Sequence, residues 1–426
     1  MQQIASKNAP PPSLVVPHFA VGAILWLVAS TLIALHPEIF TQHYFSPKLL
    51  AITHLVVLGW ISMIIFGALY QLIPVILETK LFSEKFARIS FYTLIIGTLL
   101  LSYSFWNSQL KLPLHVAVTF LLISVVLFAI NVFFTATKAE KQSIEKKFII
   151  TSVTWLLLTV SLGILAALNL SQSFLTINHL ELLKIHAHWG IVGWFLQLII
   201  GVGSKLLPMF MVSHHLNTKK LTLAYVLINL GLIAGTIEIL VPTSILLYFS
   251  AVLILVGVFS FLSFLFEAYQ KRIKKSLDKG MKQSMIAFLI LIIPMLMMIV
   301  LQLNLPNLTL FKTELSLAYG VTLLIGFISS LVMGQTYKTL PFIVWLKVYK
   351  NKVGKGNIPF PKDLYSERIA TIQLWGFTIG FIGFLTGILL NHNITLQISS
   401  IIMLIAVILF AVNVLKIIFH QPKTHE

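Results

Sequence analysis

The chain has 426 residues, of which 58% are hydrophobic and only 10% are charged, and it carries a formal net charge of +17. Soluble globular domains average about 45–50% apolar and about 25% charged residues, so this composition excludes that class and indicates an integral membrane protein. The chain has no cysteine, which excludes disulfides, thiolate metal sites, iron–sulfur clusters and haem attached through cysteine. Any metal or haem would therefore be held by His, Met, Tyr or carboxylates.

Twelve segments are apolar enough and long enough to cross a bilayer, which takes about 20 residues of helix. In chain order they are 17–37, 50–76, 87–107, 114–136, 148–170, 184–212, 220–240, 244–268, 284–304, 314–345, 367–390 and 397–419. Residues 1–16 lack the compact apolar core of a secretory signal, and we expect them to form a cytoplasmic tail. The sequence predicts an all-α integral membrane protein with about twelve transmembrane helices and no soluble domain.

Lys and Arg are concentrated in every second link between these segments. Links such as "TKAEKQSIEKK" and "EAYQKRIKKSLDKGMK" hold most of the positive charge, whereas the alternate links, such as "VPTS", carry almost none. The positive-inside rule then places the basic links and both termini in the cytoplasm. The net charge is explained by topology, so it does not indicate nucleic acid; anionic lipid is the only partner it suggests.

One frame recurs on the second, sixth and tenth segments. Residues 54–74 read "HLVVLGWISMIIFGALYQLIP" and residues 188–208 read "HWGIVGWFLQLIIGVGSKLLP", and both contain H-x-x-x-x-G-W and a Gly seven residues before the closing Pro. Residues 321–341 keep a Gly beside Phe327 and the same Gly-to-Pro spacing. The glycines indicate close helix contact or room for a flat ligand. The repeat predicts three four-helix units, at approximately 17–140, 147–275 and 284–420.

Histidines stand at the front of two of these copies. An ionisable residue in a transmembrane segment is a functional hypothesis by default, and His54 and His188 occupy the same place about 30 Å of helix before the closing Pro. His186 lies about 200° around the helix from His188, so the two point into different spaces. We interpret His54, His186 and His188 as candidate cofactor and metal ligands. The alternative, interfacial histidines bonded to backbone, stays open.

These features resemble subunit I of the haem–copper oxidase superfamily, which includes cbb3-type oxidases, nitric oxide reductases and, more distantly, NnrS-like haem proteins. The resemblance covers nearly the whole chain in architecture and three helices in motif. It implies that His54, in "THLVVLGW", binds a low-spin haem and that His188 matches a copper ligand by position. The family's His-x-His pair on the tenth helix is replaced here by Tyr319 and Val321, and such a pair occurs on the sixth helix instead, as His186 and His188.

The resemblance implies a degenerate member without a complete binuclear centre. Its expected cofactor is one haem b between His54 and His188, or between His54 and His186; copper is implied only through His188. The implied role is electron transfer or nitric oxide or oxygen handling in the bacterial inner membrane, with other respiratory or electron-donor subunits as partners. Two further hypotheses stay open: a channel or carrier for a metal ion or haem, with histidines along its path, and a partner or chaperone subunit with vestigial histidines.

Overall fold

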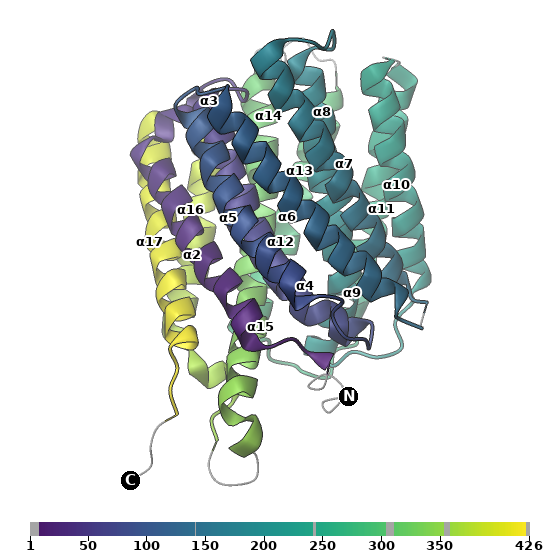
Figure 1. Cartoon of the computed structure of the whole chain (residues 1–426), viewed down its shortest axis with the longest axis vertical. Coiled ribbons are helices and arrows are strands. Elements are labelled where there is room, and N and C mark those ends of the chain that lie inside the picture. The colour runs from purple at the N-terminus through teal and green to yellow at the C-terminus, as the bar shows by residue number, and fades with distance from the viewer. Residues whose placement is uncertain (1–7, 141, 242–243, 304–310, 353–357, 423–426) are drawn as a thin grey trace.

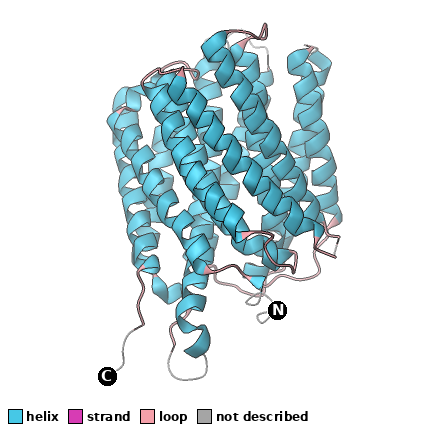
Figure 2. Ribbon diagram, in the orientation of Figure 1, coloured by secondary structure: helices cyan, strands magenta, loops and turns pink. Residues whose placement is uncertain are grey.

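A computed structural model describes all residues except 1–7, 141, 242–243, 304–310, 353–357 and 423–426. The described residues form helices, turns and loops and contain no strand (Figure 2). Within these described residues, twelve helices are long and apolar enough to span a membrane. The predicted class, an all-α membrane protein with twelve spanning helices, is confirmed.

The first four spans, which we call the first unit, consist of α2 (Pro12–Leu35), α3 (Pro47–His54), η2 (Leu55–Ser62), α4 (Met63–Ile76), α5 (Glu84–Trp106) and α6 (Leu112–Thr137). The second contains α7 (Ile144–Gln172), α8 (His179–His188), η3 (Trp189–Leu196), α9 (Gln197–Met211), α10 (Lys219–Leu240) and α11 (Ser244–Gln270). The third contains α12 (Lys279–Ile290), α13 (Ile292–Gln302), α14 (Lys312–Val321), η5 (Thr322–Ser329), α15 (Ser330–Tyr349), α16 (Glu367–Leu389) and α17 (Asn393–Ile418).

The first spanning helix begins earlier than the sequence predicts. α2 starts at Pro12 rather than at residue 17, because a proline in the first turn has no N–H that needs an intrahelical partner. Leu14 and Val15 are buried in the core, which holds this turn against the bundle. Residues 12–16, which we expected in the N-terminal tail, are therefore helical.

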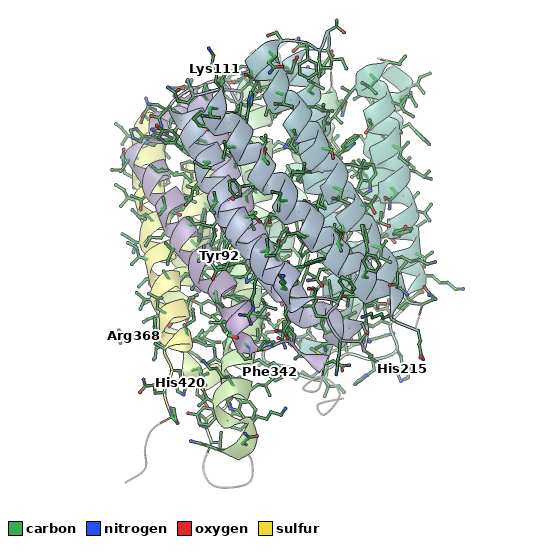
Figure 3. All side chains as sticks on the ribbon, in the orientation of Figure 1. Tyr92, Lys111, His215, Phe342, Arg368 and His420 are labelled. Atoms are coloured by element: carbon green, nitrogen blue, oxygen red, sulfur yellow. The ribbon has the colours of Figure 1, made fainter. Side chains whose placement is uncertain are left out.

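Helix α2 begins and helix α17 ends at the same end of the bundle (Figure 1). Figure 3 shows His215, Arg368 and His420 toward this end, whereas Lys111 lies at the opposite one. His215 lies in the link after the sixth span and Arg368 is at the start of the eleventh, so the basic links after the sixth and tenth spans reach this end. We call this the basic end, and we call the opposite end, where α3 and α8 lie, the histidine end.

Three long helices form the centre of the bundle. The second, sixth and tenth spans (Pro47–Ile76, His179–Met211 and Lys312–Lys352) bury 72%, 67% and 72% of their apolar windows, against 28–56% for the other nine. The outer nine helices therefore present more of their surface to lipid. The recurring frame of the sequence lies on these three central helices, where a repeated motif from each unit can meet the others.

Each central helix contains a π-helical segment at the same place in the frame. The segments η2, η3 and η5 begin at Leu55, Trp189 and Thr322, which are 134 and 133 residues apart, as are the closing prolines. π-helical turns are rare and occur frequently at functional sites. The first two segments begin directly after His54 and His188.

The glycine seven residues before each closing Pro allows close packing within a unit. Gly67, Gly201 and Gly334 face α2, α7 and α12, the first helix of their own unit. A Cβ on Gly201 would lie 2.6 Å from the Cβ of Phe148, and one on Gly334 would lie 2.7 Å from the carbonyl oxygen of Gly280. The sequence suggested that these glycines allow either close helix contact or room for a flat ligand; in the structure they allow close helix contact.

We expect Gly334→Ala to lower the thermal stability of the detergent-solubilised protein. The new methyl group would meet backbone atoms of α12, and overpacking of this kind costs roughly 1–3 kcal/mol. Gly320→Ala is the matched control, because a Cβ there would meet nothing within 4 Å. Equal melting temperatures for the two variants would contradict this role of Gly334.

An ionic cluster ties the third unit together at the basic end. Asp278 precedes α12 and caps it by accepting a hydrogen bond from the backbone N–H of Met281, at 3.1 Å. Its carboxylate also accepts from Lys338 Nζ on α15 at 2.6 Å and from Lys274 Nζ at 3.1 Å. Burial raises the pKa of Asp278, but the charge of Lys338 and the hydrogen bonds from Lys338, Met281 and Lys274 outweigh it and hold the pKa below its usual value.

This cluster predicts a pH-dependent stability difference between the wild type and Asp278→Asn. Asparagine still caps the helix, but it leaves Lys338 without its charged partner, at a cost of roughly 1–3 kcal/mol. The pKa of Asp278 is lower in the folded protein than in the unfolded chain. The charge pair therefore stabilises the protein at pH values above the unfolded-state pKa of about 4. This stabilisation is lost as the pH falls through the folded-state pKa. The difference in melting temperature should therefore be largest at neutral pH and shrink in acid; a constant difference would contradict the pairing.

Candidate cofactor site between the first and second units

His54 is fixed by its own helix at the histidine end. It is the last residue of α3, and its Nδ1 donates to the carbonyl oxygen of Leu50 at 2.8 Å. Its ring lies 5.4 Å from the ring of Phe105 on α5, centroid to centroid. Because a carbonyl only accepts, Nδ1 carries the proton of the neutral imidazole and Nε2 carries the lone pair that binds metals.

His186 is oriented by the neighbouring helix α7. Its Nδ1 donates to the carbonyl oxygen of Thr159 at 3.0 Å, so its Nε2 also carries a free lone pair. Gly163 lies one turn further along α7, and a Cβ there would lie only 2.7 Å from Cε1 of this imidazole. The backbone of α7 therefore both holds the ring and leaves the space that the ring occupies.

The structure brings His54 and His186 together. Their ring centroids are 6.3 Å apart with an interplanar angle of 32°, and α3 and α8 both lie at the histidine end in Figure 1. Two imidazoles that bind one metal ion from opposite sides, through nitrogens at about 2.0 Å, have centroids roughly 6 Å apart. The spacing of the two rings therefore suits one ion between them, at the interface of the first and second units.

His188 lies on another side of the same helix. Its Nδ1 donates to the carbonyl oxygen of Lys184 at 2.7 Å, one turn earlier in α8. Residues two positions apart are about 200° apart around a helix, so the ring of His188 points away when His186 faces α7. Within the described part of the chain, His54 makes ring contacts with His186 and Phe105 but none with His188.

The donor set of this pair is one that haem uses. Both imidazoles are half-buried, and each directs Nδ1–H to a backbone carbonyl, the outer contact that typically orients a metal-binding histidine. A six-coordinate haem iron needs only two ligands from the protein, because the porphyrin supplies four nitrogens. Across the described ranges no three His, Asp or Glu side chains gather as a metal site. His54 and His186 are therefore the residues that could hold a haem iron.

A polar network joins α7 to α9 and α10. The indole N–H of Trp155 on α7 donates to Oδ1 of Asn229 on α10 at 2.9 Å. Asn229 also exchanges two hydrogen bonds with the side-chain amide of Gln197 on α9, at 3.0 and 3.1 Å. Hydrogen bonds between helices stabilise packing in lipid, and this network fixes the helix that carries Thr159 and Gly163.

Thr159 and Gly163 are contributors that the sequence did not reveal. They lie four residues apart on one face of α7, in the segment "TVSLG", which carries no motif. Comparison with known proteins adds no family: no protein-family model matches the chain, and no curated protein matches it either. The histidine pair and the contacts that orient it are therefore the basis for assigning a function.

We expect Gly163→Val to weaken cofactor binding without unfolding the protein. The valine side chain would displace the imidazole of His186 and break its bond to Thr159, and loss of such an outer contact typically lowers affinity roughly 10- to 100-fold. A haem titration followed by absorbance, with elution volume as the test of folding, measures this. Gly320→Val provides the control, since its position is open; equal haem affinity in both variants would contradict the role of Gly163.

Proposed function

We propose that the protein is a haem-binding membrane protein of the haem–copper oxidase subunit I type, with one haem b held by His54 and His186. The observation that carries the proposal is the 6.3 Å separation of the two imidazoles. The proton of each Nδ1 is held by a backbone carbonyl, which leaves both Nε2 atoms as ligands. A haem held there would supply electron transfer, or binding of nitric oxide or oxygen.

The chain's own residues would set the behaviour of this site. His54 comes from the first unit and His186 from the second, so the bound group would join two units of the bundle. Both side chains are half-buried near the histidine end, which the positive-inside rule assigns to the outer side of the membrane. An electron donor would therefore approach from that side, and the bacterial inner membrane is the location that we propose.

The proposal differs from the family's pattern in one respect. Tyr319 and Val321 stand where the family has its His-x-His pair, and the paired imidazoles lie instead between the first and second units. A complete binuclear centre is therefore not part of the proposal, and His188 alone does not make a copper site. The function that we propose is electron transfer, or handling of nitric oxide or oxygen, at a single haem.

Alanine substitutions test the pairing directly. We expect His54→Ala and His186→Ala each to lower the haem content of the purified protein about tenfold or more, because each removes one of two axial ligands. His188→Ala is the matched control, since it removes an imidazole two residues away on the same helix. His214→Ala serves as a second control at the basic end. Haem content is measured as the pyridine haemochrome per chain.

Two results would contradict this assignment. Loss of haem in His188→Ala with full retention in His186→Ala would mean that His54 pairs with His188. Full retention in all four variants would mean that none of these histidines binds haem.

A further inference from the structure

A cavity of about 110 Å³ lies among the three central helices. It is formed by α4, α9 and α15, the parts of these helices toward the basic end (Figure 1). Its wall contains the same five positions of each copy: 64, 65, 68, 69 and 72; 198, 199, 202, 203 and 206; and 331, 332, 335, 336 and 339. The copies are offset by the same 134 and 133 residues as the closing prolines, so the cavity lies on the axis around which the three units repeat.

The cavity exists because two of these positions hold small residues. Ala68 and Gly203 occupy places where other copies carry larger side chains. Gly203 is not required for helix contact: a Cβ there would first meet the side-chain atoms Cδ1 of Leu207 at 3.3 Å and Cζ of Phe261 at 3.9 Å. Ala68, Val202 and Gly203 in its wall are only partly buried, so the space is open on one side and a small molecule can enter it.

The wall of the cavity is almost entirely hydrocarbon. Its polar side chains all come from the third copy, and their donors are used within the protein. Thr336 and Thr339 donate to backbone carbonyls of their own helix at 2.8 Å, and Gln335 Nε2 donates to Ser284 Oγ at 2.7 Å. A buried water needs two to four polar partners, whereas an apolar cavity of about 150 Å³ stays dry and binds benzene or xenon.

We propose that this axial cavity binds one small apolar molecule, of the size class that includes xenon and the diatomic gases. Binding follows from the volume and the hydrocarbon wall alone and does not require haem. Nitric oxide and dioxygen belong to this class, so the cavity would hold either gas within the same bundle as the haem. This link between the cavity and the haem rests on the proposed function.

Xenon is the probe for this site. The full-length protein in detergent should show saturable xenon binding by hyperpolarised-xenon NMR. Val202→Phe should abolish it, because the phenyl ring enters the cavity. Val226→Phe is the matched control, since Val226 lies on α10 and is 45% exposed on the outer surface. Comparison of the two variants also corrects for xenon dissolved in the micelle.

A second substitution keeps the test decisive if Val202→Phe does not fold. Ala68→Leu adds a smaller group at the equivalent position of the first copy and should also abolish saturable binding. The proposal is overturned if the wild type binds no xenon saturably, or if a folded cavity variant binds it as the wild type does. His54→Ala should bind xenon normally, so failure of the haem assignment and failure of the cavity assignment are distinguishable.

Discussion

The fold depends on close contact between helices that gain little from hydrophobic burial in lipid. Inside a bilayer every backbone N–H and C=O must be satisfied within the protein, which leaves helices as the spanning elements. Lipid is as apolar as the side chains, so helices associate through tight packing and a few hydrogen bonds. Gly67, Gly201 and Gly334 provide that packing in each unit. The three central helices, and everything that they carry, are held by these contacts.

A symmetric scaffold is used asymmetrically at the histidine end. His54, His188 and Val321 are equivalent positions of the three copies, and His186 is equivalent to Tyr319. Equivalent interfaces between units therefore present different side chains. Among the described residues, the imidazoles of His54 and His186 meet at the interface of the first and second units. The same asymmetry appears in the axial cavity, whose polar side chains come from the third copy alone.

Much of the architecture follows from the sequence because membrane helices obey simple rules. Hydropathy and length predicted twelve spans, and the recurring frame marked the three that lie at the centre. The start of α2 was misplaced because we placed the helix boundary at Pro17, whereas the helix begins at Pro12 and continues through Pro17. The π-helical segments were not predicted, because composition does not encode a shift in hydrogen-bond register.

The site was predicted only in part. The sequence named His54, His186 and His188, but it left open which pair would meet. That choice depends on how α8 is rotated and on the carbonyl of Thr159, which comes from α7. The space at Gly163 depends on the same contact between two helices. Periodicity within one segment describes one helix at a time, so a contact between α7 and α8 lay outside what it could predict.

The most direct measurement is an absorption spectrum of the purified, detergent-solubilised protein, oxidised and reduced, with iron and copper determined on the same sample. A haem held by two imidazoles predicts a sharp α-band on reduction and about one iron per chain. A colourless protein that contains no iron would contradict the central claim that His54 and His186 hold a haem.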